Sequence, residues 1–264
     1  MKFEHYTLKK RLGSMLKVDF RRMFTMPFIY IVVGACLVMP VLILVMTTMM
    51  DGSVSVDPQT GAETVIEGFD YVWQIIGAGG GDAAAAMSIT SMCNINMLYF
   101  LLAVPVCVFV ADDFRSGYVK NLFTVRAKKS DYVISKTLVC FVGSALMVLA
   151  FFVGSILGGA VSGLSFEMVG FTKDELVMCV ISKVMLTLIF VPIYLIMSAV
   201  AKQKLWLSFL LSFMVGMFFF MVIPMLTPIN ATIVNVLICL FGGVLFAVGF
   251  GLISMKILNK TALV

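Results

Sequence analysis

The sequence is short of charge and almost without histidine. Charged residues make up 12% of the 264 residues, and the one histidine is His5. Soluble domains carry about 25% charged residues, so this composition excludes an ordinary soluble fold. A lone histidine near the start of the chain also excludes a histidine-based metal cluster and argues against a Ser-His or Cys-His catalytic pair.

Motifs for nucleotide hydrolysis and metal binding are missing as well. The phosphate-binding pattern G-x-x-x-x-G-K-[ST] does not occur, and the glycine-rich run at residues 77–86 has no following Lys-Ser or Lys-Thr. The six cysteines form no C-x-x-C pair, and we interpret them as buried apolar residues. We therefore expect no enzymatic activity, no metal site and no cofactor bound by the chain itself.

Hydrophobic residues make up 61% of the sequence and gather in long runs that are almost free of charge. Crossing the ~30 Å hydrocarbon core takes about 20 apolar residues in a helix, and no alternating barrel pattern is visible. We predict an all-α polytopic membrane protein whose transmembrane domain covers residues 28–255. Gly154 and Gly158 form a small-xxx-small ridge, which predicts close helix packing. The six predicted spans are residues 28–48, 87–111, 137–160, 176–200, 205–226 and 231–255.

The basic residues lie almost entirely on one side of these spans. Seven of the 19 Lys and Arg residues fall within residues 1–27, and six fall within residues 111–136. Residues 51–86 carry six acidic residues and no Lys or Arg. We therefore predict a multi-pass plasma-membrane protein with both termini cytoplasmic, a cytoplasmic tail at 256–264 and an outer segment at 51–86. That acidic segment either attracts basic peptides or is simply a solvated loop.

Residues 1–27 have apolar residues at helical spacing, with basic residues mostly on other faces. This pattern predicts a cytoplasmic amphipathic helix on the inner leaflet. The alternative is a basic flank that only anchors the first span. A cleavable signal peptide is not expected, because more than 25 mostly polar residues precede the first apolar run.

The segment ADDFRSGYVKNLFTVRAKKSDYVISK, residues 111–136, is too long for a simple turn between two helices. Phe114, Tyr118 and Leu122 are spaced four residues apart and form one apolar stripe if the segment is helical. Asp112 and Asp113 are expected at the start of that helix, where negative charge suits its dipole. The stripe must be covered by the bilayer surface, by the ends of its own spans or by another protein.

This segment resembles the cytoplasmic loop of ABC-2 type permeases, the membrane subunits of ATP-binding-cassette exporters. That loop often reads F-x-x-E-x-x-x-G-T-x-x-x-L, followed by S-R and a Lys. Gly117 and residues 130–136 match it best, whereas Asp113 stands where Glu is commoner. The resemblance implies a coupling helix that docks in a groove of a separate ATPase. It assigns this docking to Phe114, Arg115, Gly117, Tyr118, Lys120, Leu122, Phe123 and Arg126.

The resemblance also implies partners and a function. The partners are two copies of a cytoplasmic ATPase, which bind ATP and Mg, a second identical or different permease subunit, and membrane lipids, but no nucleic acid. The implied function is outward movement of an amphipathic peptide, drug or lipid by alternating access, and the length of residues 51–86 resembles peptide-exporting members. The alternatives are an ATP-independent secondary transporter, a vitamin-uptake membrane component and an intramembrane enzyme. No acidic residue for ion coupling lies within a predicted span.

Candidate residues for a substrate pathway are fewer and carry alternatives. Lys183, about seven residues into the fourth span, reaches outward to the headgroups, pairs with an outer acid, or contacts substrate. The two asparagines of the second span line a polar cavity or hydrogen-bond between helices, and the Met- and Phe-rich run at 213–225 faces either cargo or lipid. The candidates are Asn94, Asn96, Lys183, Phe213, Met217 and Phe219.

Overall fold

The computed structural model describes residues 8–56, 63–65, 68–77, 94–124, 128–202, 204–220 and 223–261. Nearly all of them are helical, which confirms the predicted all-α fold of a polytopic membrane protein. Within these residues five helices are long and apolar enough to cross a membrane, and a shorter apolar helix accompanies them. The one sheet among them is a two-stranded antiparallel hairpin.

The described residues form helices of different lengths and two short strands. They are α1 (Leu8–Thr25), α2 (Pro27–Met50), β1 (Val54–Val56), β2 (Glu63–Val65), η1 (Val72–Ile75), η3 (Ile95–Met97), α4 (Leu98–Arg115), α5 (Tyr118–Thr124), α6 (Lys129–Ser162), α7 (Lys173–Ala201), α8 (Leu205–Phe220), α9 (Ile223–Leu226) and α10 (Ile233–Thr261).

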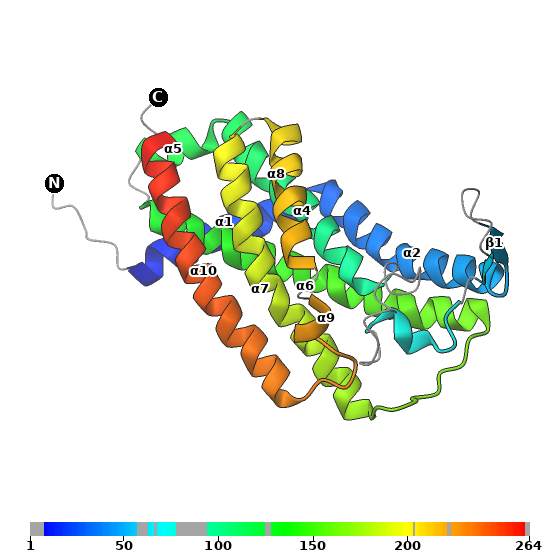
Figure 1. The fold of residues 1–264 in the computed structure, drawn as a ribbon. Helices are drawn as coiled ribbons and strands as arrows, with labels where there is room; N and C mark the ends of the chain where they lie inside the picture. Colours follow the sequence, from blue (N-terminus) through cyan, green and yellow to red (C-terminus); the bar gives the residue numbers. More distant parts are fainter. Residues whose placement is uncertain are drawn as a thin grey trace.

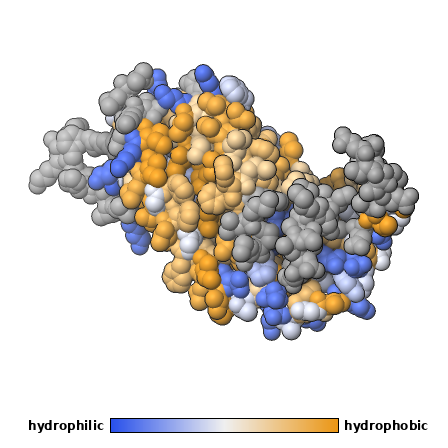
Figure 2. Space-filling model, in the orientation of Figure 1, coloured by the Kyte–Doolittle hydropathy of each residue, from blue (hydrophilic) through white to orange (hydrophobic). Residues whose placement is uncertain are grey.

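The long helices form a bundle centred on α6 and α7. Helix α2 packs along α6, α10 packs along α7, and α4 and α8 fill the space against α7. Figure 1 places α1, α5 and the end of α10 at one end of the bundle, with β1 and the α6–α7 connection at the other. A broad apolar band lies between hydrophilic residues gathered towards these ends in Figure 2, as expected of a membrane bundle.

Helices α2 and α6 approach each other closely because glycine replaces larger residues at their contact. A Cβ on Gly154 would lie 2.7 Å from Cγ of Pro40, and one on Gly158 would lie 2.9 Å from Cδ1 of Leu44. Real Cβ atoms almost never come this close, so the contact requires residues without a side chain. The predicted glycine packing ridge is confirmed.

Residues 1–27 were predicted as one helix, and the structure places α1 within them as a separate helix. The chain is extended at Met26, directly before Pro27, because a residue preceding proline is biased away from the helical region. Helix α1 buries Met15 and Met23, and it packs against α6. Its position on a membrane surface stays a prediction.

Within the predicted fifth span, residues 205–226, the structure describes two helical stretches. Helix α8 has 16 residues, about 24 Å of helix, and α9 has four. Residues 221–222, between them, lie outside the described residues. The continuity of the fifth span stays a prediction.

Part of the predicted outer segment 51–86 is packed and not solvated. Trp73 of η1 stacks on Phe152 of α6 with ring centroids 6.2 Å apart, and its indole nitrogen donates to the carbonyl of Phe166 at 3.0 Å. Ile75 and Ile76 are fully buried. Residues 57–62, 66–67 and 78–86 lie outside the described residues, and so does the predicted start of the second span at residue 87.

Candidate coupling site and intramembrane lysine

The predicted docking segment is two helices with a sharp turn between them. Helix α4 runs to Arg115, and Gly117 follows with a φ of +71°, a left-handed conformation that glycine adopts without strain. Helix α5 then begins at Tyr118. The expectation of one continuous helix is therefore wrong, and Asp112 and Asp113 lie in the last turn of α4 and not at a helix start.

The apolar side of this segment faces the bundle. Val119 is 4% exposed, and the partly buried Leu122 and Phe123 pack with it against Tyr132 of α6 and Leu258 of α10. The rings of Phe123 and Tyr132 meet edge to face with centroids 5.8 Å apart. Phe114 packs against the same cluster. The apolar stripe was expected to be covered by the bilayer surface, by the ends of its own spans or by another protein. In the structure the ends of its own spans cover most of it.

The other side of α5 is polar and exposed. Lys120, Asn121 and Thr124 are exposed there, and so is Arg115 at the end of α4. Arg126 lies outside the described residues. A protein that docks on this segment therefore meets polar and basic side chains before it meets the apolar stripe.

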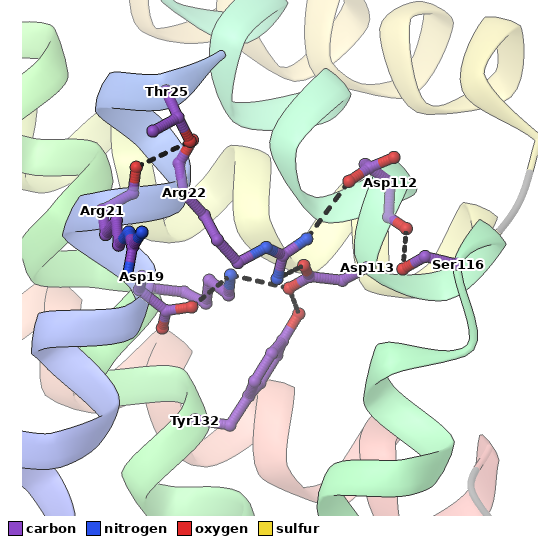
Figure 3. Close-up of polar contacts among 9 residues, drawn as sticks. Asp19, Arg21, Arg22, Thr25, Asp112, Asp113, Ser116 and Tyr132 are labelled. Atoms are coloured by element: carbon purple, nitrogen blue, oxygen red, sulfur yellow. Dashed lines mark hydrogen bonds and ion pairs between the residues drawn. The ribbon is translucent and has the colours of Figure 1, made fainter.

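A buried ionic cluster lies directly behind α5, and the sequence did not predict it. Lys136 of α6 places its ammonium 2.9 Å from Oδ1 of Asp19 on α1 and 2.7 Å from Oδ2 of Asp113 on α4. All three side chains are 0% exposed. Arg22 of α1 reaches between the neighbouring aspartates, with 2.6 Å to Asp113 and 3.1 Å to Asp112 (Figure 3).

Hydroxyl groups complete the coordination of these carboxylates. Tyr132 donates to Oδ2 of Asp113 at 2.9 Å, and Ser135 donates to Oδ2 of Asp19 at 2.6 Å. The ammonium of Lys136 also lies 3.8 Å from the centroid of the Phe109 ring. Buried charges are tolerated when paired and hydrogen-bonded in this way. The cluster therefore ties α1, α4 and α6 together at one point.

Tyr118, the first residue of α5, connects this helix to the cluster. The guanidinium of Arg22 lies over its ring, 4.4 Å from the centroid. Burial raises the pKa of the Tyr118 phenol, and the negative charges of Asp19 and Asp113 raise it further. Burial lowers the pKa of Arg22, but the charge and hydrogen bond of Asp113 outweigh burial, so this pKa lies above its ordinary value. Both groups keep their protons at neutral pH.

A signal for the cluster was present in the sequence. Met15, Asp19 and Met23 are spaced four residues apart, so Asp19 falls on the apolar face of α1. A carboxylate on a buried face requires a nearby cation. The sequence did not identify that cation. Lys136 lies directly before the predicted third span, where a basic residue is expected at the membrane surface whether or not it has a buried partner.

Lys183 occupies the second polar site and does not reach outward. It is 0% exposed, and its ammonium donates to Oδ1 of Asn96 at 3.3 Å and to Oγ1 and the carbonyl of Thr227 at 2.9 and 3.4 Å. Among the described residues no carboxylate lies within ion-pair distance of it. The predicted snorkelling to headgroups is therefore wrong. Asn94 accepts from the backbone N–H of Asn96 at 2.9 Å, so these three candidates come together.

The other candidates for a substrate pathway do not share this site. Phe213 and Met217 are 53% and 52% exposed on α8, although the ring of Phe213 also lies 5.3 Å from that of Phe100 on α4. Phe219 packs inward, with ring centroids 6.2 Å from Phe190 and 6.3 Å from Phe246. The Met- and Phe-rich run therefore has one face towards the core and one towards its surroundings.

The bundle, its apolar band and the charged end that carries α5 define a multi-pass membrane protein. A family model described as ABC-2 family transporter protein matches residues 16–222, and the chain belongs to this family. It is thus the membrane component of an ABC transporter, which works with an ABC ATPase and is not itself the ATPase. No curated protein and no solved structure matches the chain.

Proposed function

We propose that the chain is the permease subunit of a plasma-membrane exporter that moves an amphipathic peptide, drug or lipid outward by alternating access. Two copies of a cytoplasmic ATPase, which bind ATP and Mg, drive it, and a second permease subunit completes the pathway. The observation that carries this proposal is the position of α5, which presents an exposed polar face and lies against a buried ionic cluster joining three helices.

In this proposal a movement of α5 is transmitted to the bundle through two contacts. The first is the contact of Tyr118 with Arg22, which in turn binds the carboxylates of the cluster. The second is the packing of Val119 against the apolar ends of α6, α7 and α10. Paired charges in a buried site resist separation, so α1, α4 and α6 move as a unit. Closure of an ATPase pair beneath α5 would in this way tilt the bundle.

Ion-gradient coupling is the weaker alternative. It requires an acidic residue inside the bundle that is able to gain and lose a proton. Asp19 and Asp113 are buried, but each lies within 2.9 Å of the Lys136 ammonium. Both carboxylates are therefore held in ion pairs that join helices, which suits a structural link better than a proton carrier.

The proposal is tested by purifying the tagged permease in complex with its ATPase. We expect a subunit with a P-loop and Mg-dependent ATP hydrolysis in the preparation. The variant Lys120→Glu combined with Thr124→Glu should lower recovery of this complex by about tenfold, because it reverses the charge of the exposed face of α5. Leu122 is a poorer choice for this test, since it packs against the permease itself.

Lys204→Glu is the matched control. This lysine is also exposed, but it lies in the short connection between α7 and α8. Full recovery in the control, with loss in the α5 variant, supports docking on α5. Equal recovery of the ATPase with both variants contradicts it, and ATP-independent accumulation of a fluorescent amphiphile in inverted vesicles contradicts ATP-driven export.

A further inference from the structure

Lys136 and Lys183 are both fully buried, but within the part of the chain that the structure describes only Lys136 has carboxylates at ion-pair distance. Lys136 has two carboxylates at 2.9 and 2.7 Å. Lys183 has three neutral acceptors, one from Asn96 and two from Thr227, at 2.9 to 3.4 Å. These acceptors satisfy the three N–H donors of an ammonium, and no carboxylate of the described residues lies within ion-pair distance of it. An ionisable side chain inside a membrane bundle is costly, and it marks a candidate functional position.

A purely structural role for Lys183 does not require its charge. The lysine donates to the carbonyl of Thr227, just after the last residue of α9, where a donor stabilises the end of a helix. A neutral amide of similar length would donate equally well. What the amide would not provide is attraction for an anion.

The surroundings of Lys183 can provide further donors to an anion. The Asn96 amide carries two N–H groups, and the Thr227 hydroxyl, which now donates to the Ile223 carbonyl at 3.0 Å, can turn. Thr227 directly follows α9.

A run of aromatic rings begins at the backbone of Lys183. Tyr99 donates its hydroxyl to the Lys183 carbonyl at 2.9 Å, and its ring lies 4.9 Å from that of Phe190. Phe190 in turn contacts Phe219 of α8. A cation beside a run of aromatic rings matches a molecule with one anionic group and an apolar tail.

We propose that Lys183, with Asn96 and Thr227, binds the carboxylate or phosphate group of an amphipathic anion. This inference rests on the proposed function, because it names the chemical class of the cargo carried by the permease. The ammonium provides the attraction, and the amide and hydroxyl fix the orientation of the anionic group.

The test uses the full-length permease alone, in nanodiscs of zwitterionic lipid, and measures its thermal unfolding. Lysophosphatidic acid is the anionic probe. Lysophosphatidylcholine of the same chain length is the zwitterionic control with no net charge, and glycerol 3-phosphate is the control that has the headgroup but no apolar tail. We expect lysophosphatidic acid alone to raise the Tm of the wild type, by roughly 5 °C near saturation. Lys183→Gln should lose this shift, and Lys173→Gln, at an exposed lysine of the same helix, should keep it.

Asn96→Asp keeps the test decisive if the glutamine variant does not fold. The new carboxylate would lie at the position of the Asn96 oxygen, 3.3 Å from the ammonium, and would act as an internal counter-ion. We expect this variant to be more stable without lipid and to show no shift with lysophosphatidic acid. A full shift in either variant, no shift in the wild type, or an equal shift with glycerol 3-phosphate overturns the proposal.

Failure of this proposal and failure of the proposed function are distinguishable. The nanodisc measurement contains no ATPase, so its outcome does not depend on docking at α5. If the anionic probe does not bind while the ATPase still co-purifies, the permease function stands and its cargo belongs to another chemical class.

Discussion

Lys136 is the residue at which three helices of the permease are joined. Its ammonium forms ion pairs with one carboxylate from α1, Asp19, and one from α4, Asp113. Asp113 also contacts Arg22, but among the described residues the one other side chain bonded to Asp19 is Ser135, through its hydroxyl. Loss of the lysine would therefore leave a buried carboxylate without a cation.

We predict that Lys136→Met destabilises the permease by about 3–5 kcal/mol, the usual cost of breaking a buried ion pair from one side. The double variant Lys136→Met with Asp19→Asn should recover part of this loss, since it removes the stranded charge as well. Thermal unfolding of the purified protein measures both. Lys120→Met is the control, because Lys120 is exposed and should tolerate the same change. A single variant as stable as the wild type would contradict this prediction.

The raised pKa of Tyr118 predicts that the stability of the permease depends on pH in the alkaline range. This pKa is raised above 10.0 because the phenol is partly buried and faces the charges of Asp19 and Asp113. The folded protein then holds this proton more tightly than the unfolded chain, so the stabilisation is complete below pH 10 and is lost as pH rises further. As the pH rises above about 10, the wild type should lose more thermal stability than Tyr118→Phe. Parallel losses in the two proteins would exclude this contribution.

Among the elements, α6 shows why the sequence located the spans better than it located their ends. The apolar run at 137–160 predicts a span, but α6 has 34 residues, about 51 Å of helix, and begins at Lys129. Its first turns carry Lys129, Asp131 and Lys136, which read as loop residues because hydropathy alone separates apolar runs from charged ones. The cluster lies in this extension, so predicting it required contacts between distant segments.

The coupling segment was predicted correctly as a structured element and wrongly as one helix. The spacing of Phe114, Tyr118 and Leu122 fits an unbroken helix, and nothing in that spacing reveals the left-handed turn at Gly117. Glycine is compatible with both outcomes. Packing against the ends of α6 and α10 decides between them, and that packing is a tertiary property.

The α2–α6 contact is an element-scale feature with a direct test. Gly154→Ala would place a methyl group against the Leu37 carbonyl and 2.7 Å from Pro40, so the helices must separate. We expect a loss of about 1–3 kcal/mol in stability, the usual cost of overpacking. Gly242→Ala on α10, where a Cβ would meet no atom within 4 Å, should leave stability unchanged or slightly raise it.

An equally stable Gly154→Ala protein would show that α2 and α6 are not packed as closely as described. The pair of variants separates packing from helix propensity, because both replace a helical glycine with alanine. Their difference reports only the space available at each site.

At the scale of the whole molecule, the distribution of charge and the arrangement of helices agree. The positive-inside rule assigns residues 1–27, 111–136 and 256–264 to one side of the membrane. In the structure α1, α5 and the end of α10 lie together at one end of the bundle, although they are far apart in the sequence. An even number of crossings then requires α8 and α9 together to count as one passage beside the five long apolar helices.

This topology predicts the accessibility of single cysteines introduced at exposed positions. Lys120→Cys on α5 and Lys256→Cys on α10 should react with a membrane-impermeant thiol reagent only from the cytoplasmic side, whereas Asp174→Cys at the start of α7 should react only from outside. The native Cys36, Cys107, Cys140, Cys179 and Cys239 are buried, and a Cys93→Ser background removes the sixth cysteine. Labelling of Lys120→Cys and Asp174→Cys from the same side would contradict the crossing of α6. Labelling of Lys256→Cys opposite to Lys120→Cys would mean that α8 and α9 do not pass through the membrane.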